Sequence, residues 1–110
     1  MALTPEGKVK TQVKVALKRL GVYYFCPVTS GYGTSGAPDF IVCMHGRFIG
    51  IECKAKGNKM TRLQEQAAGK IRAAGGLHYE VNEWTIGTLL GALESMDKIW
   101  RAAKELDNDG

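Results

Sequence analysis

The alternation of apolar and polar positions predicts a chain of short helices and strands. Thr4-Pro5-Glu6 is a typical helix start, and Gly21 is a typical helix end. Between them, apolar residues recur at helical spacing: Val9, Val13, Leu17 and Leu20. Glu6 is expected on this core-facing side, and the lysines of the helix are expected on its other faces: Lys8, Lys10, Lys14 and Lys18.

The remaining segments predict an α/β fold. Thr61 begins a second helix, with Gln64 placed as in a capping box. The expected elements after the first helix are a strand at 22–28, a glycine-rich loop at 29–37, strands at 38–44 and 47–54, a helix from Thr61 to Gly75, a strand at 77–82 and a helix from about 85 to 106. The order α-β-β-β-α-β-α predicts a central mixed four-stranded sheet flanked by helices.

Length and composition narrow the class of protein. With 110 residues, 45% of them apolar, the chain suits one domain covering residues 1–110. It has no run of about eighteen apolar residues and no secretory-signal pattern at its start, so we expect a cytoplasmic protein without a membrane span. The small size is typical of proteins of phages and other mobile elements. Cys26, Cys43 and Cys53 lie in apolar runs without C-x-x-C pairing, which predicts buried free thiols.

Basic residues are in excess and are locally concentrated. The formal net charge of +4 and the pI near 9.1 favour a polyanionic partner. The segment from Lys54 to Arg62 is the most basic and directly follows a predicted strand. Phosphate contacts are therefore predicted for Lys56, Lys59 and Arg62, with a merely solvated surface as the alternative.

The second and third strands form a hairpin that brings two acids together. If His45-Gly46 is a two-residue turn, Asp39 lies directly opposite Glu52, and Lys54 lies on the same face. Apolar neighbours on both faces predict that these acids lie at the end of a buried sheet. Such a pair is costly without a counter-charge, and a divalent cation such as Mg²⁺ would supply one. The alternative is a pair of solvated or salt-bridged strand ends.

Two further segments make this arrangement resemble a known nuclease family. Gly36-Ala37-Pro38-Asp39-Phe40 followed by Ile51-Glu52-Cys53-Lys54 resembles the PD-(D/E)XK nuclease signature. With Thr61-Arg62-Leu63-Gln64 downstream, the chain is more narrowly similar to the VRR-NUC family, in which G-x-P-D, E-x-K and [ST]-x-x-Q occur in this order. The resemblance covers roughly residues 4–82 and implies a restriction-endonuclease-like core.

The resemblance assigns metal and catalytic roles by position. It implies that Asp39, Glu52 and the backbone carbonyl of Cys53 hold Mg²⁺, for which Mn²⁺ can substitute. Lys54 would orient the attacking water or help to deprotonate it, and would stabilise the developing charge. The implied reaction is metal-assisted hydrolysis of a phosphodiester bond.

Glu6 and Gln64 each have a functional and a structural interpretation. The resemblance implies that Glu6 reaches the site from the first helix, where it binds a second metal or a metal-bound water. The alternative for Glu6 is an acid that interacts with the helix dipole. Gln64 would position Lys54 or the water, whereas in a capping box its amide turns back to the N–H of Thr61.

The glycine-rich loop allows two interpretations. The segment from Gly31 to Gly36 matches G-x-G-x-x-G, but a strand follows it, and a dinucleotide-binding fingerprint needs a helix there. We predict instead that the loop follows a DNA backbone, with a plain connector as the alternative. Its predicted contact residues are Ser30, Gly31, Tyr32 and Gly33.

These expectations combine into a magnesium-dependent, structure-specific DNA endonuclease. The resemblance to stand-alone VRR-NUC domains implies a homodimer that resolves four-way (Holliday) junctions, since a symmetric pair of sites can cut two strands. An exposed part of the last apolar helix stripe would provide the dimer surface, with Trp100 as an anchor. The alternatives are a flap or 5′-end nuclease, a nucleic-acid-binding module without catalysis, and a structural subunit.

Overall fold

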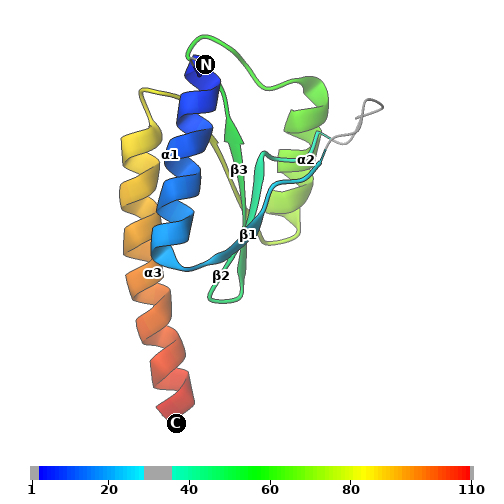
Figure 1. Ribbon diagram of the computed structural model, residues 1–110. Helices are drawn as coiled ribbons and strands as arrows, with labels where there is room; N and C mark the ends of the chain where they lie inside the picture. The colour runs from blue at the N-terminus through cyan, green and yellow to red at the C-terminus, as the bar shows by residue number, and fades with distance from the viewer. Residues whose placement is uncertain (1–2, 29–35, 110) are drawn as a thin grey trace.

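The computed structural model describes residues 3–28 and 36–109, and it confirms the predicted order of elements (Figure 1). The elements are α1 (Pro5–Leu20), β1 (Tyr23–Phe25), β2 (Phe40–Met44), β3 (Arg47–Cys53), α2 (Arg62–Ala73), β4 (Leu77–Val81) and α3 (Ile86–Asp109). Within these ranges, none of the helices combines the length and the hydrophobicity that crossing a membrane requires.

The strands form one mixed sheet with helices on both faces. The strand order is β1-β2-β3-β4, with β4 parallel to β3 and the other neighbours antiparallel. A parallel neighbour needs a crossover connection, which α2 supplies. Helices α1 and α3 pack side by side on one face, whereas α2 lies on the other (Figure 1). The sheet is therefore the middle layer of the fold.

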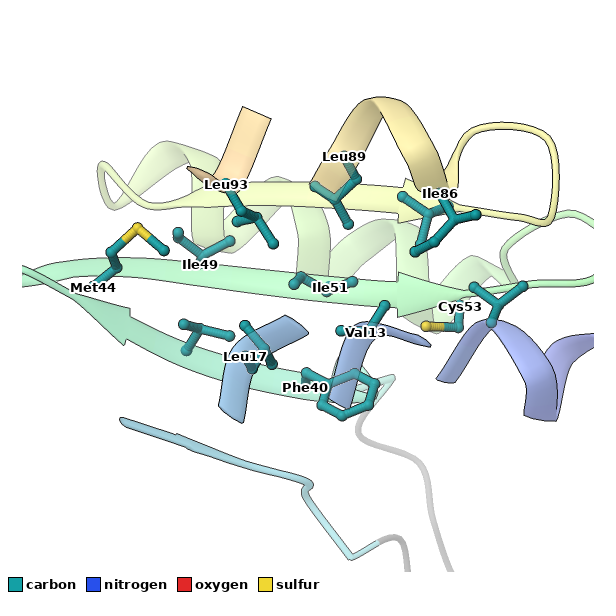
Figure 2. Close-up of a cluster of buried hydrophobic side chains, with 13 residues drawn as sticks. Val13, Leu17, Phe40, Met44, Ile49, Ile51, Cys53, Ile86, Leu89 and Leu93 are labelled. Carbon is teal, nitrogen blue, oxygen red and sulfur yellow. The ribbon is translucent and has the colours of Figure 1, made fainter. Parts of the chain in front are cut away.

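The main hydrophobic core lies between the sheet and the α1–α3 layer. Three of the four predicted apolar positions of α1, Val9, Val13 and Leu17, are fully buried, while Leu20 is partly buried against the core. Figure 2 shows side chains of α1 and α3 meeting the same face of β2 and β3. The members drawn and labelled there are Val13, Leu17, Phe40, Met44, Ile49, Ile51, Cys53, Ile86, Leu89 and Leu93.

The first strand is shorter than the expected 22–28 and forms the edge of the sheet. It spans Tyr23–Phe25 and pairs only with β2. Pro27 has no N–H for the ladder, and Val28 is 95% exposed, so pairing ends before them. Apolar, β-branched composition alone therefore overestimated this strand.

The expectation of three buried thiols was wrong for two of them. Cys53 is buried on the core face of β3, but Cys26 and Cys43 are exposed. Cys26 follows the short edge strand, and Cys43 lies on the opposite sheet face from the core. Phe48, paired with Cys43, is 44% exposed as well. This face of the sheet is thus open at the hairpin end, contrary to the expectation of a sheet buried on both sides.

Gly36 sets the distance between the segment before β2 and the start of α2. Its φ is +60°, and a Cβ built there would lie 2.2 Å from the carbonyl oxygen of Leu63 and 2.7 Å from the backbone nitrogen of Gln64. A residue with a Cβ cannot stand at this position without moving the backbone. The absence of a side chain at Gly36 therefore lets the backbone before β2 lie against the first turn of α2.

We predict that Gly36→Ala destabilises the protein more than Gly46→Ala does. Both glycines have positive φ, but a Cβ at Gly46 meets no atom within 4 Å. Gly46→Ala should therefore cost only the conformational strain, about 1–2 kcal/mol, whereas Gly36→Ala adds a backbone clash. Equilibrium unfolding in denaturant measures both, and equal losses would contradict the close approach described above.

Candidate functional site

The β2–β3 register confirms that Asp39 and Glu52 lie opposite each other. Phe40 pairs with Ile51 and Met44 with Arg47, so the next position outward pairs Asp39 with Glu52. His45 and Gly46 both have positive φ, at 49° and 83°, as a tight two-residue hairpin turn requires. No bulge shifts the pairing, and the two acids share one face of the sheet.

Asp39 is fixed by the backbone of the neighbouring strand. It lies in a bend immediately before β2, and its Oδ2 accepts a hydrogen bond of 2.8 Å from the backbone N–H of Cys53. This bond orients the carboxylate toward the end of β3, where Glu52 and Lys54 flank Cys53. The hairpin partner strand therefore supplies a backbone group that holds the carboxylate of Asp39.

Glu52 is buried and only partly satisfied. Glu52 is only 2% exposed, and its Oε1 accepts a hydrogen bond of 3.1 Å from Nε2 of Gln64. Among the described residues, its Oε2 has no hydrogen-bond partner although it is buried. Burial, together with the negative charge of Asp39, raises the pKa of Glu52 to about 8. The site thus offers a carboxylate oxygen that lacks a partner.

Gln64 combines the two interpretations that the sequence left open. Its Oε1 accepts a hydrogen bond of 2.9 Å from the N–H of Thr61, while its own N–H donates to Oγ1 of Thr61 at 3.2 Å. This reciprocal pair is a capping box. Because the amide oxygen is used in the cap, the amide nitrogen is turned toward Glu52. The cap therefore holds Gln64 in the orientation in which it contacts the acid pair.

Lys10 lies at the site, although it was expected on an outer face of α1. Its Nζ is 3.4 Å from Oδ1 of Asp39 and 3.4 Å from Oε2 of Glu6. The pKa of Lys10 is raised, because the carboxylates of Asp39 and Glu6 outweigh the opposing effect of burial. The helical face was misjudged because the packing of α1 on the sheet brings Lys10 to Asp39, the residue just before β2. The i,i+4 spacing from Glu6 was the available signal.

Lys54 directly follows β3 and lies on the same face of the sheet as Glu52. Its backbone N–H donates to the carbonyl of Val81 at 2.8 Å, which continues the β3–β4 ladder beyond Cys53. Alternation along the strand places Lys54 on the same face as Glu52, and its positive charge partly offsets the rise in the pKa of Glu52. The ammonium group is therefore close enough to Glu52 to act on its charge.

Comparison with known structures identifies the fold. A solved structure described as a VRR_NUC domain matches with a TM-score of 0.66 and 25% sequence identity, over 81% of this chain and 97% of that chain. This chain has the VRR-NUC fold. Neither the family models nor the curated proteins gave a match. The VRR-NUC neighbour supports a nuclease domain of the PD-(D/E)XK type.

In this VRR-NUC fold, the predicted motif residues lie together at one end of the central strands β2 and β3. Asp39 and Glu52 are directly opposed, Gln64 contacts Glu52, and Lys54 lies on the same face. Glu6 is linked to the acid pair indirectly. It forms an ion pair with Lys10, and Lys10 in turn contacts Asp39. The orientation of the Cys53 carbonyl stays a prediction, whereas its N–H holds Asp39.

The parallel strand adds an acid that sequence reasoning did not single out. Glu80 is the register partner of Glu52 and lies on the same face of the sheet, but it is exposed. Within residues 3–28 and 36–109, no three His, Cys, Asp or Glu side chains converge as a ready metal-binding group. Asp39 and Glu52 are thus the opposed pair of acids at this end of the sheet, with Glu80 exposed beside them.

The predicted DNA-binding residues divide into two groups. Lys56 and Lys59 are exposed on the segment that leads from β3 to α2, and Arg62 is exposed at the first position of α2. The predicted loop contacts lie outside the described residues: Ser30, Gly31, Tyr32 and Gly33. Among the residues that the structure describes, the basic segment is therefore the candidate for contact with phosphate groups near the end of β3.

We predict that the contribution of Glu52 to the stability of the metal-free protein falls as pH rises from about 5 to 8. The pKa of Glu52 is raised from 4.5 to about 8 on folding, so between these values the folded state binds one more proton than the unfolded state. The stabilisation that this proton provides is fully present below pH 4.5 and is lost as pH rises through 8. The slope should not exceed about 1.4 kcal/mol per pH unit. Denaturant unfolding across this range, in the presence of a chelator, measures it.

The matched variants for this pH series are Glu52→Gln and Glu80→Gln. Glu52→Gln removes the titrating group and should flatten the pH dependence, whereas Glu80→Gln changes an exposed acid on the same sheet face and should leave it in place. An unchanged slope in Glu52→Gln would show that the buried carboxyl does not carry the effect.

Proposed function

We propose that the protein is a magnesium-dependent DNA endonuclease that hydrolyses phosphodiester bonds. The observation that carries the proposal is the opposed pair Asp39 and Glu52, in which a buried oxygen of Glu52 has no hydrogen-bond partner among the described residues. A buried carboxylate oxygen without a partner is costly, unless a cation or a proton occupies the position next to it. The VRR-NUC fold supports the same reaction class.

The donor set suits a hard divalent cation. Oxygen atoms of Asp39 and Glu52 would hold Mg²⁺, with the carbonyl of Cys53 as a third candidate, and Mn²⁺ can substitute. Mg²⁺ usually takes only one or two protein carboxylates and keeps several waters, so it does not require a third converging acid, and none is found among residues 3–28 and 36–109. The bound ion would supply charge stabilisation and an activated water.

The side chains around the acid pair have separable roles in this proposal. Lys54 orients the attacking water and offsets the charge that builds on the phosphoryl group. Gln64 holds the carboxylate of Glu52 through its amide nitrogen. Lys10 neutralises Asp39 and keeps Glu6 near the site, so that Glu6 acts through this lysine.

DNA is the proposed substrate because the site opens beside a basic segment. Lys56, Lys59 and Arg62 are exposed directly after the strand that carries Glu52. Their role is to hold phosphate groups along the path to the acid pair. The catalytically inactive binding module, the rival proposal, would use the same surface without cutting.

Branched DNA and a homodimer are the finer part of the proposal. A pair of identical sites related by two-fold symmetry can cut two strands of a four-way junction. The outer half of α3 supports a dimer surface, since Ile99 is 65% exposed and Leu106 73% exposed. Trp100, the anchor expected from sequence, is partly buried against the core with Arg47 over its ring at 4.7 Å, and its part in a dimer surface stays a prediction. A flap nuclease is the alternative specificity.

We predict that Asp39→Asn abolishes cutting while DNA binding persists. Loss of one charge at the metal position should lower the cleavage rate by at least about 10²–10³-fold, the range for losing a single group that stabilises transition-state charge. The assay uses labelled four-way junction, flap and plain duplex, first with Mg²⁺ and then with chelator. Cutting in chelator, or near-normal cutting by Asp39→Asn, would contradict the metal assignment. Equal cutting of all three DNAs would remove the junction specificity.

We predict that Thr61→Ala and Gln64→Ala separate capping from catalysis. Both variants break the capping box, at a cost of about 1 kcal/mol in unfolding free energy. Only Gln64→Ala also removes the contact with Glu52, so it alone should strongly lower the cleavage rate. The measurements are denaturant unfolding and single-turnover cleavage. A similar activity loss in both variants would reduce Gln64 to a structural role.

A further inference from the structure

Trp84 is a large aromatic side chain that the core does not use. It lies in the turn between β4 and α3 and is 72% exposed, whereas Trp100 is half-buried on α3. Exposing an indole ring to water forfeits the burial energy that normally places tryptophan in a core or an interface. The ring therefore requires an explanation other than packing within this chain.

The turn that carries Trp84 is held by a network of hydrogen bonds. Oδ1 of Asn82 accepts from the N–H of Trp84 at 2.9 Å and from the N–H of Thr85 at 3.2 Å, while the N–H of Asn82 donates to Oγ1 of Thr85 at 3.0 Å. The backbone under the ring is thus fixed by three side-chain contacts. A ring carried on an ordered backbone needs no ordering of that backbone when a ligand stacks on it.

Lys56 lies over one side of this ring and belongs to the chain segment that directly follows Lys54 at the end of β3. Its Nζ lies 4.5 Å from the centroid of the Trp84 ring, and its backbone N–H donates to a carboxylate oxygen of Glu83. A single ammonium group can cover only one face of an indole, and the exposure of Trp84 leaves other ring surface open. Lys56 is two residues beyond Lys54, so both lysines lie at the same end of β3.

An aromatic face beside a cation is the chemistry that recognises an unpaired nucleotide. The ring stacks on the base, and the ammonium group contacts the phosphate next to it. Bases inside a duplex are stacked on each other and cannot reach such a ring. We propose that Trp84 and Lys56 form a stacking platform for an unpaired base of the DNA substrate, next to the cleavage site. The proposal rests on the proposed nuclease function. Within that function it favours DNA with unpaired nucleotides, the flap alternative, over a fully paired four-way junction.

The test compares binding of forked and blunt DNA by Trp84 variants. In the metal-free Asp39→Asn background, which separates binding from cutting, Trp84→Ala should weaken binding of a forked DNA with unpaired arms by about 5- to 100-fold. Binding of a blunt duplex of matched sequence should change less than about twofold, since phosphate contacts remain. Trp84→Leu keeps apolar bulk without a stacking face and should behave as Trp84→Ala does, whereas Trp84→Phe should retain most of the affinity.

Trp100→Phe provides a matched control and an optical readout. It changes the other tryptophan, which packs against the core, and should leave forked-DNA binding unchanged. In this variant Trp84 is the remaining tryptophan of the chain, and forked DNA, but not duplex, should quench its fluorescence. Thermal melts of each variant check folding.

Three outcomes would overturn the platform. They are an equal loss on forked and duplex DNA, no loss on forked DNA, or a change in oligomeric state of Trp84→Ala by light scattering with unchanged DNA binding. The nuclease proposal has a separate readout, which is magnesium-dependent cutting by the wild-type protein. Selective loss of forked-DNA binding without any cutting would support the platform and overturn the nuclease proposal.

Discussion

The site depends on two carboxylates that the hairpin forces to face each other at the end of a buried strand. Asp39 and Glu52 would repel each other, and burial makes the charged form of Glu52 more costly. The surrounding groups all reduce this cost: the N–H of Cys53 and the ammonium of Lys10 contact Asp39, and the amide of Gln64 contacts Glu52. One oxygen of Glu52 still lacks a partner among the described residues, so the stabilisation is incomplete without a proton or a cation.

Three layers of the fold converge on this pair. The α1 helix supplies Lys10, the hairpin supplies the acids, and the first turn of α2 supplies Gln64. The close approach of Gly36 to the backbone of α2 joins the last two, because a side chain there would separate them. Stability and site geometry are thus linked through backbone contacts as well as through side chains. This linkage explains why a capping residue can also be a site residue.

The elements and the acid pair could be predicted from the sequence because they follow from local rules. A two-residue turn fixes the register of a hairpin, and the alternation of side chains then places Asp39, Glu52 and Lys54 on one face. Predictions that required knowledge of the neighbouring layer were less accurate. The exposure of Cys43 depends on how far α2 covers the sheet, and that of Cys26 depends on where the edge strand ends. The local sequence specifies neither the extent to which α2 covers the sheet nor the residue at which the edge strand ends.

The sequence by itself determined the order of the elements, the hairpin register and the candidate acids, since each depends on residues close together in the chain. Only the tertiary structure decided that Lys10 contacts Asp39, that the cap on α2 turns Gln64 toward Glu52, and that Trp84 stays exposed beside Lys56. Each of these contacts joins segments far apart in the sequence. Their geometry depends on how helices pack across the ends of strands, and a helical or strand periodicity does not specify that packing.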